Sequence, residues 1–212
     1  MLGSWTKTSR NFLILLILCA VALSTVSPFL ISQYKKSAIE LRKAEIKRLV
    51  SFGINSIETY RNQYNEGMIS RSEALKNITE KIRGFTYRDH AQENYLFMSS
   101  YDGTMLVQPY QPEKEGSNQI ELVDSDGVYI IRELIKQAKQ GSGFVNYRYP
   151  PPNSDKPQIK ISYVVGLPEL ECYIGTGIYI NDIEAIILQH SRQMIFFLLA
   201  VFIIILGTAL YI

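Results

Sequence analysis

Two stretches of this chain, Asn11–Tyr34 and Gln193–Ile212, contain no charged residue, and every acidic residue lies between them. A bilayer core about 30 Å thick needs about 20 apolar residues in a helix that rises about 1.5 Å per residue. We therefore expect one transmembrane helix at residues 12–32 and a second at residues 193–212. A domain held between two such helices would lie across the membrane from both chain ends.

Lys7 and Arg10 precede the first stretch with no acid nearby, which favours a cytoplasmic segment at residues 1–11. Residues 33–190 then form one extracytoplasmic domain. A cleaved signal peptide is the alternative for the first stretch, although the apolar core of such peptides is usually about 7–15 residues long. The chain ends with the second stretch, and we expect either a longer receptor or a small membrane protein without an effector of its own.

The composition argues against several classes of function. The 22 basic residues include Lys7 and Arg10, so 20 basic residues balance 20 acidic ones after the first stretch, which gives no electrostatic footprint for nucleic acid. The only histidines, His90 and His190, are far apart and have no cysteine beside them, so we expect no metal site and no cofactor. We find no catalytic set of residues and predict that the chain is not an enzyme. Signal output is expected from a part outside these residues.

Helical periodicity begins directly after the first stretch. Over residues 33–64 apolar residues recur at spacings of three and four, which predicts one long helix. Its length exceeds what a small domain needs, so we expect part of it to pack against a second copy in a homodimer. Ser70 and Glu73 form a capping-box pattern that begins a shorter helix, and Gly84 ends it.

The period then changes to two, which is typical of strands. Asp102-Gly103 is a hairpin turn signal between the first two strands, and Asp126 can cap a helix over residues 128–139. The glycines of Gly175-Thr176-Gly177 are explained by close backbone packing inside a strand. Short turns between consecutive strands predict an α+β fold with a five-stranded antiparallel sheet. The five predicted strands are Asn94–Ser99, Met105–Tyr110, Gly143–Tyr149, Gln158–Val165 and Glu171–Tyr179.

Five ordered segments resemble the motifs of the single-module Cache sensor domains. They are Asn94–Met98, Tyr101–Tyr110, Gly143–Tyr147, Lys160–Val164 and Ile174–Ile180. The resemblance covers about residues 35–190. It implies a PAS-like sheet behind a long N-terminal helix, placed outside the membrane in bacterial chemoreceptors, sensor histidine kinases and cyclic-dinucleotide enzymes. It also implies a small organic acid as the class of ligand.

A pocket for a small carboxylate needs hydrogen-bond donors on one side and apolar walls on the other. Lys160 lies among apolar residues and is the expected polar anchor, with a surface lysine as the alternative. Gln108 stands where the resemblance often places a histidine, so a neutral ligand is also plausible. Tyr163, three residues from Lys160, should face the other side of a regular strand. The candidate ligand residues are Tyr95, Phe97, Gln108, Arg132, Tyr147, Lys160 and Tyr163.

The alternatives for these candidates are ordinary structural roles. Tyr95, Phe97 and Tyr147 could simply be core residues, and Arg132 could form a surface ion pair. Taken together, the sequence predicts a two-pass protein of the bacterial inner membrane. Its periplasmic or extracellular domain would bind a small organic acid and relay a conformational change across the membrane. The alternative is a membrane-anchored protein whose domain binds a partner protein instead of a small molecule.

Overall fold

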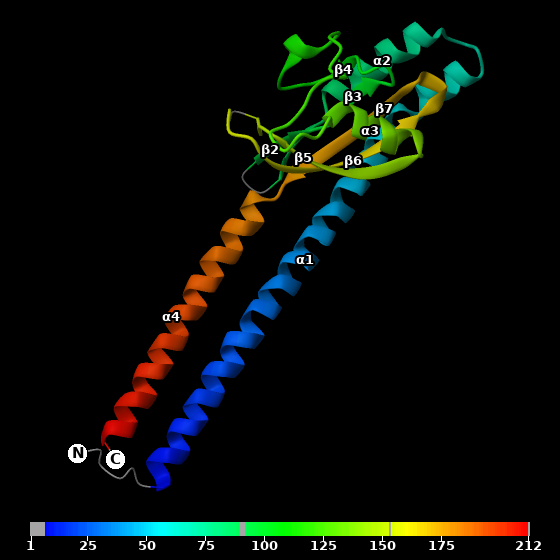
Figure 1. The fold of residues 1–212 in the computed structure, drawn as a ribbon. Helices are drawn as coiled ribbons and strands as arrows, with labels where there is room; N and C mark the ends of the chain where they lie inside the picture. The colour runs from blue at the N-terminus through cyan, green and yellow to red at the C-terminus, as the bar shows by residue number, and fades with distance from the viewer. Residues whose placement is uncertain (1–6, 90–91, 153, 212) are drawn as a thin grey trace. The chain divides into compact units, whose positions relative to one another are not determined.

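Figure 1 labels the helices α1 to α4 and the strands β2 to β7 of the chain. The computed structural model describes residues 7–89, 92–152 and 154–211. The chain divides into two units. One unit comprises residues 1–39 and 182–212, of which the described residues are helical, and residues 40–181 form a compact unit that contains the β-sheet.

The helical unit consists of the first part of α1 (Lys7–Asn65) and nearly all of α4 (Asn181–Tyr211). Over the part of the chain that the structure describes, no helix has a stretch both long and apolar enough to cross a membrane. Residues 1–6 of the predicted cytoplasmic segment, and residue 212 of the second predicted span, lie outside the described residues. The two membrane spans stay a prediction.

The second part of α1 belongs to the compact unit and packs on its sheet. Ile46, Val50 and Ile57 are completely buried, as the spacing of three and four residues predicts. The helix expected over residues 33–64 is confirmed, since all of these residues are helical. Leu41 and Phe52 remain exposed on the same helix.

The shorter helix α2 (Arg71–Arg83) begins and ends where its capping residues predict. The Ser70 hydroxyl accepts a hydrogen bond from the Glu73 amide at 3.2 Å, which satisfies one of the amides that have no partner inside the helix. Gly84 is the C-terminal cap. The buried face of α2, with Ile78 and Ile82, joins α1 in one hydrophobic core.

The main sheet of the described residues has five antiparallel strands in the order β4-β3-β7-β6-β5. Gly103, at a φ of 94°, makes the turn between β3 and β4. The predicted α+β fold with a five-stranded antiparallel sheet is confirmed. The strands are β3 (Phe97–Ser100), β4 (Met105–Val107), β5 (Ser142–Tyr149), β6 (Gln158–Leu167) and β7 (Cys172–Tyr179). The 3-10 turns Pro112–Lys114 and Pro168–Leu170 lie in the connections.

The strand predicted at Asn94–Ser99 was wrong in one respect, because the chain changes sheets within it. β2 (Gln92–Tyr95) pairs with β1 (Thr86–Asp89) in a separate two-stranded sheet, and β3 begins only at Phe97. Between them, the Leu96 amide donates to the Phe85 carbonyl at 3.0 Å. The alternation of side chains continues through this junction, so residues two apart still share a face.

The helix α3 (Ile130–Lys139) begins two residues later than predicted, and Asp126 does not cap it. Its N-terminal cap is Tyr129, which makes no side-chain capping bond. Asp124 instead accepts hydrogen bonds from the amides of Asp126 and Val128 at 2.9 and 2.8 Å, and so forms a turn before the helix. The competing side-chain bond of this turn explains the later start.

The two faces of the sheet carry two separate cores. On one face, α1 and α2 cover side chains such as Met98 and Ile174. On the other, α3 packs on β5 and β6 and covers an aromatic cluster that includes Tyr147 and Tyr173. The candidate site lies in this second, aromatic core.

Candidate ligand site

Lys160 lies in the middle of the sheet, where β6 pairs with strands on both sides. Its register partners are Tyr147 on β5 and Tyr179 on β7. The side chain is only 2% exposed. Ser162, two residues along β6, accepts or donates a hydrogen bond with the Tyr147 hydroxyl at 2.8 Å, so both β6 residues face the aromatic core. A lysine this deeply buried is rare unless it has a partner.

Four aromatic rings surround the Lys160 ammonium. Its Nζ lies 4.6 Å from the ring centre of Tyr95, 5.1 Å from Tyr179, 5.5 Å from Tyr149 and 5.6 Å from Phe97. Ring faces attract a cation, most strongly where water is excluded. Within the described residues no carboxylate forms an ion pair with this amine. The rings therefore form a cage that has no anion of its own.

Burial changes the ionisation of the whole cluster. It lowers the pKa of Lys160 from 10.5 to about 7, because a charged amine loses its hydration in the cage. The same loss of hydration raises the pKa of Tyr95, Tyr147 and Tyr179 above the usual value. These phenols stay neutral at physiological pH, whereas the lysine titrates close to it.

A small inner cavity of about 20 Å³ lies beside the cage, which is room for about one water molecule. The Gln108 amide reaches it from the segment after β4, with its Nε2 3.5 Å from the Tyr149 hydroxyl. Its Oε1 is buried without a hydrogen-bond partner in the described structure. The lining residues are Tyr95, Phe97, Met105, Gln108, Leu122, Ile130, Ile131, Leu134, Tyr147, Tyr149 and Lys160.

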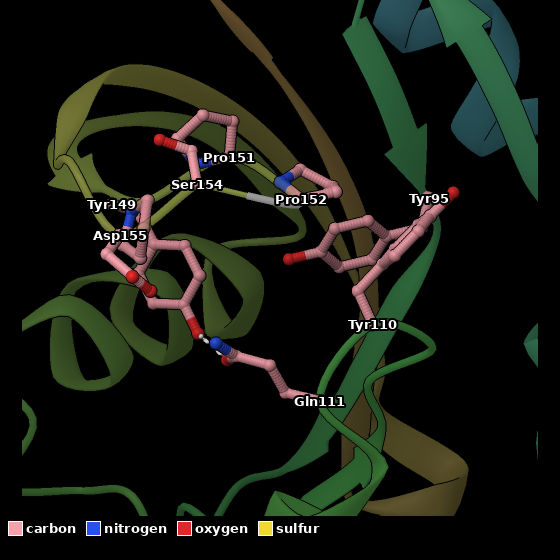
Figure 2. A pocket seen from close by; sticks show the side chains of 9 residues that line it. Tyr95, Tyr110, Gln111, Tyr149, Pro151, Pro152, Ser154 and Asp155 are labelled. Carbon is pink, nitrogen blue, oxygen red and sulfur yellow. Dashed lines mark hydrogen bonds between the residues drawn. The ribbon is translucent and has the colours of Figure 1, made fainter.

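A larger outer pocket of about 210 Å³ adjoins the inner cavity and shares Tyr95 and Tyr149 with it. Figure 2 shows Gln111 reaching across to Tyr149, whose hydroxyl donates to Gln111 Oε1 at 2.6 Å. The ring of Tyr110 lies against Tyr95, with 5.3 Å between their centres. The remaining lining comes from the proline-rich segment after β5. Tyr95 and Tyr149 thus line both spaces, whereas Lys160 lines the inner cavity alone.

The profile of the family named Single Cache domain 2 matches residues 38–193. The chain belongs to this family. The resemblance inferred from the five ordered segments is thereby confirmed, and the compact unit with its aromatic core is a Cache domain.

Relatives of this Cache protein are larger receptors. The sensor histidine kinase MctS of Rhizobium johnstonii is 32% identical over 155 residues, which are 73% of this chain and 32% of that protein. The methyl-accepting chemotaxis protein McpP of Pseudomonas putida is 24% identical over 187 residues, which are 88% of this chain and 33% of that protein. The chain thus spans about a third of the length of these curated relatives.

Solved structures share the fold of the Cache domain. The periplasmic sensor domain of a chemotaxis protein is 26% identical, with a TM-score of 0.61 over 67% of this chain and 97% of that one. A Cache chemosensory domain, solved to explain its recognition of carboxylic acid, is 24% identical, with a TM-score of 0.62 over 68% of this chain and 97% of that one. The second likeness concerns the fold alone.

The Cache fold brings together five of the seven residues that the sequence singled out. These are Tyr95, Phe97, Gln108, Tyr147 and Lys160, which all line the inner cavity. Their role in binding stays a prediction.

Tyr163 and Arg132 lie outside this cavity. Tyr163 is on the opposite face of β6, where its ring centre lies 4.9 Å from the ring centre of Phe144. The alternation of side chains along a strand predicts this for a residue three positions from Lys160. Arg132 is exposed, forms an ion pair with Glu121 and stacks over the Tyr129 ring at 4.3 Å. The sequence alternative of a surface ion pair describes Arg132 well.

Sequence reasoning missed Tyr149 and Tyr179. Tyr149 shares the parity of Tyr147 on β5, so this signal was present in the sequence. Tyr179 belongs to the cage because β7 pairs beside β6 in a register that sets it opposite Lys160. No local pattern in the sequence specifies that pairing.

Arg132→Ala is expected to change neither folding nor acid binding appreciably. An exposed ion pair contributes about 0–1 kcal/mol, and Arg132 does not line the cavity. Urea unfolding should move by less than about 0.5 kcal/mol. Calorimetry with a binding acid should give an affinity within about twofold of the parent, since twofold corresponds to only about 0.4 kcal/mol. A tenfold loss of affinity for the acid would show that Arg132 belongs to the binding site.

Proposed function

We propose that this Cache domain senses a small organic acid, whose carboxylate pairs with the Lys160 ammonium inside the aromatic cage. One observation carries the proposal: a lysine that is 2% exposed has four rings around its Nζ and no carboxylate partner among the described residues. A buried charge without a partner is costly, and an incoming anion would relieve that cost. The rings supply the apolar walls that such a ligand needs.

Gln108 is the second polar group that we assign to the ligand. Its side chain lines the cavity, where its Nε2 makes a long bond to the Tyr149 hydroxyl and the side chain also interacts with Tyr95. A carboxylate oxygen could replace these tyrosine contacts as the acceptor. Its backbone amide donates to Glu115 at 2.8 Å, which fixes where the side chain begins. A lysine and an amide together suit a short acid with one anionic group.

The size of the cavity indicates that binding must move part of its wall. A space of about 20 Å³ holds no organic acid, whereas the outer pocket beyond Tyr95 and Tyr149 measures about 210 Å³. Release of Tyr149 from Gln111 would join the two spaces. The movement of β5, which carries Tyr149, is the conformational change that we expect ligand to cause.

The relatives support a role in signalling, since they are a sensor histidine kinase and a chemotaxis receptor. The solved Cache domain that recognises carboxylic acid supports the ligand class. We propose that α1 and α4 continue into the two predicted membrane spans and carry the change across the bacterial inner membrane. The exposed Leu41 and Phe52 of α1 are where we would place a homodimer contact. Output would come from a kinase or chemoreceptor part in a longer protein.

The test is calorimetry on the purified 212-residue chain with acetate, propionate, pyruvate and lactate. At least one acid should bind, and at about 100 times its Kd it should stabilise the protein by about 2.7 kcal/mol in a thermal-shift assay. Lys160→Ala should weaken that binding about 100-fold or more, because it removes one partner of a buried charge pair.

The matched control is Lys136→Ala on α3, an exposed lysine that pairs with Glu133. It should bind the acid as the parent does. Equal affinity in the Lys160→Ala variant would remove Lys160 from the site. If no acid, amino acid or amine binds, the result would favour the alternative function, in which the domain binds a partner protein.

A further inference from the structure

Uncharged groups face the Lys160 amine from the elements packed around it. Phenols come from β2, β5 and β7, a phenyl ring from β3, an amide from the segment after β4, and aliphatic side chains from α3. These groups are Tyr95, Tyr147, Tyr149, Tyr179, Phe97, Gln108, Ile131 and Leu134. None of them can balance a positive charge with a negative one at neutral pH.

Two charged side chains near the cavity, Lys114 and Glu115, do not provide that balance. Lys114 lies beside Tyr149, with its Nζ 3.5 Å from the hydroxyl, and it adds positive charge. Glu115 is engaged by Arg83 at 2.7 Å and by the Gln108 backbone amide at 2.8 Å. Burial opposes ionisation of Glu115, but these hydrogen bonds keep the pKa of its carboxyl below the usual value. Its charge is therefore already paired.

We propose that above neutral pH the empty site holds Lys160 mainly as a neutral amine, and that a small acid then enters together with one proton. The inference rests on the proposed function and adds that the site takes up a proton with the acid. A carboxylate, one proton and the neutral amine of Lys160 together give a carboxylate paired with an ammonium. The proton comes from solvent and ends on Nζ, so the site gains no net charge. The receptor would then respond to acidity as well as to the acid.

The size of the proton uptake follows from the cage. Burial lowers the pKa of Lys160 to about 7, and a carboxylate beside Nζ would raise it again. The empty site would be about 10% neutral at pH 6 and about 90% neutral at pH 8, because the ratio changes tenfold per pH unit. Apparent affinity should therefore be nearly constant below pH 6 and fall about tenfold per unit above pH 7. The fall from pH 6 to pH 9 is about 90-fold.

Calorimetry of the full chain with acetate and with propionate tests this, in buffers with different heats of ionisation. The dependence of the observed heat on buffer gives the protons taken up per acid bound. We expect about 0.1 at pH 6 and about 0.9 at pH 8. The Arg132→Ala variant, altered outside the cavity, is the matched control and should give the same two values.

The outcomes separate this inference from the function on which it rests. An acid that binds at pH 8 with the same heat in every buffer overturns the proton coupling and leaves acid sensing intact. No binding of acetate, propionate, pyruvate or lactate at pH 6 overturns both. A nitrogen NMR titration of the empty protein, with the Lys160 signal assigned by its loss in Lys160→Met, should have its midpoint near pH 7. A midpoint near the ordinary value of about 10.4 overturns the coupling independently.

Discussion

Lys160→Met is expected to make the protein more stable, most of all at low pH. Methionine fits the length and the apolar surroundings of the buried lysine and carries no charge that needs hydration. In the folded protein the pKa of Lys160 is about 7, and in the unfolded chain it is about 10.5. Between these values the unfolded chain binds more protons, so the stability of the parent rises with pH. The penalty is complete below pH 7 and disappears as the pH approaches 10.5.

Urea unfolding at pH 6 and pH 9 measures this effect. Lys160 alone should make the parent about 2–3 kcal/mol more stable at pH 9 than at pH 6, and the variant should lack that contribution. Lys136→Met is the matched control, because Lys136 is exposed on α3 and should respond within about 0.5 kcal/mol at both pH values. A Lys160→Met variant less stable than the parent at pH 6 would show that the amine is satisfied in the folded state.

A gain in stability with a loss of binding would identify Lys160 as a residue kept for function. Natural proteins often retain a destabilising group where activity depends on it. The cage reduces the cost of the lysine through four ring contacts, but rings supply no full negative charge. The remaining cost is what a carboxylate would relieve.

Local sequence signals predicted most of the elements, since each signal depends on neighbouring residues. The cap at Ser70, the turn at Asp102-Gly103 and the period of two in β5 and β6 all act over a few residues. The same period placed Lys160 and Tyr163 on opposite faces of one strand. The alternation of side chains along the strands, together with residue type, was therefore enough to predict five of the residues that line the cavity.

What the sequence did not predict depends on contacts between distant segments. The change of sheet at Leu96 requires β1, a four-residue strand with no apolar alternation of its own. Tyr179 joins the cage only through the register of β7 against β6. The apolar side chains that α3 contributes to the cavity likewise depend on how that helix packs on the sheet. The sequence alone singled out Lys160 as the polar ligand residue, but it did not predict which distant segments would surround it.

The glycines of β7 were predicted to allow close backbone packing, and the structure shows how close. A Cβ at Gly175 would lie 2.8 Å from the Tyr163 carbonyl oxygen, closer than real Cβ contacts allow. A Cβ at Gly177 would lie 2.7 Å from Lys160 Cε and would also collide with Ser162 Oγ. Gly177 therefore leaves the space that the stem of the buried lysine fills.

Gly177→Ala is accordingly expected to damage both the fold and the site. The added methyl must push the Lys160 stem or Ser162 aside, and such overpacking usually costs about 1–3 kcal/mol. Displacing Nζ within the cage should weaken acid binding about tenfold or more, because tenfold corresponds to only about 1.4 kcal/mol. Urea unfolding and acid calorimetry on the same preparation measure the two effects.

Gly84→Ala distinguishes this steric effect from the general effect of replacing glycine. Gly84 has an ordinary φ of −75°, and the nearest atom to an added Cβ would be the Lys81 carbonyl oxygen at 3.6 Å. Alanine fits there without strain and reduces the freedom of the unfolded chain, so stability should stay level or rise slightly. Acid binding should be unchanged. If Gly177→Ala behaved like Gly84→Ala in both measurements, the lysine stem could not be held against β7, and the cage would have to be open in solution.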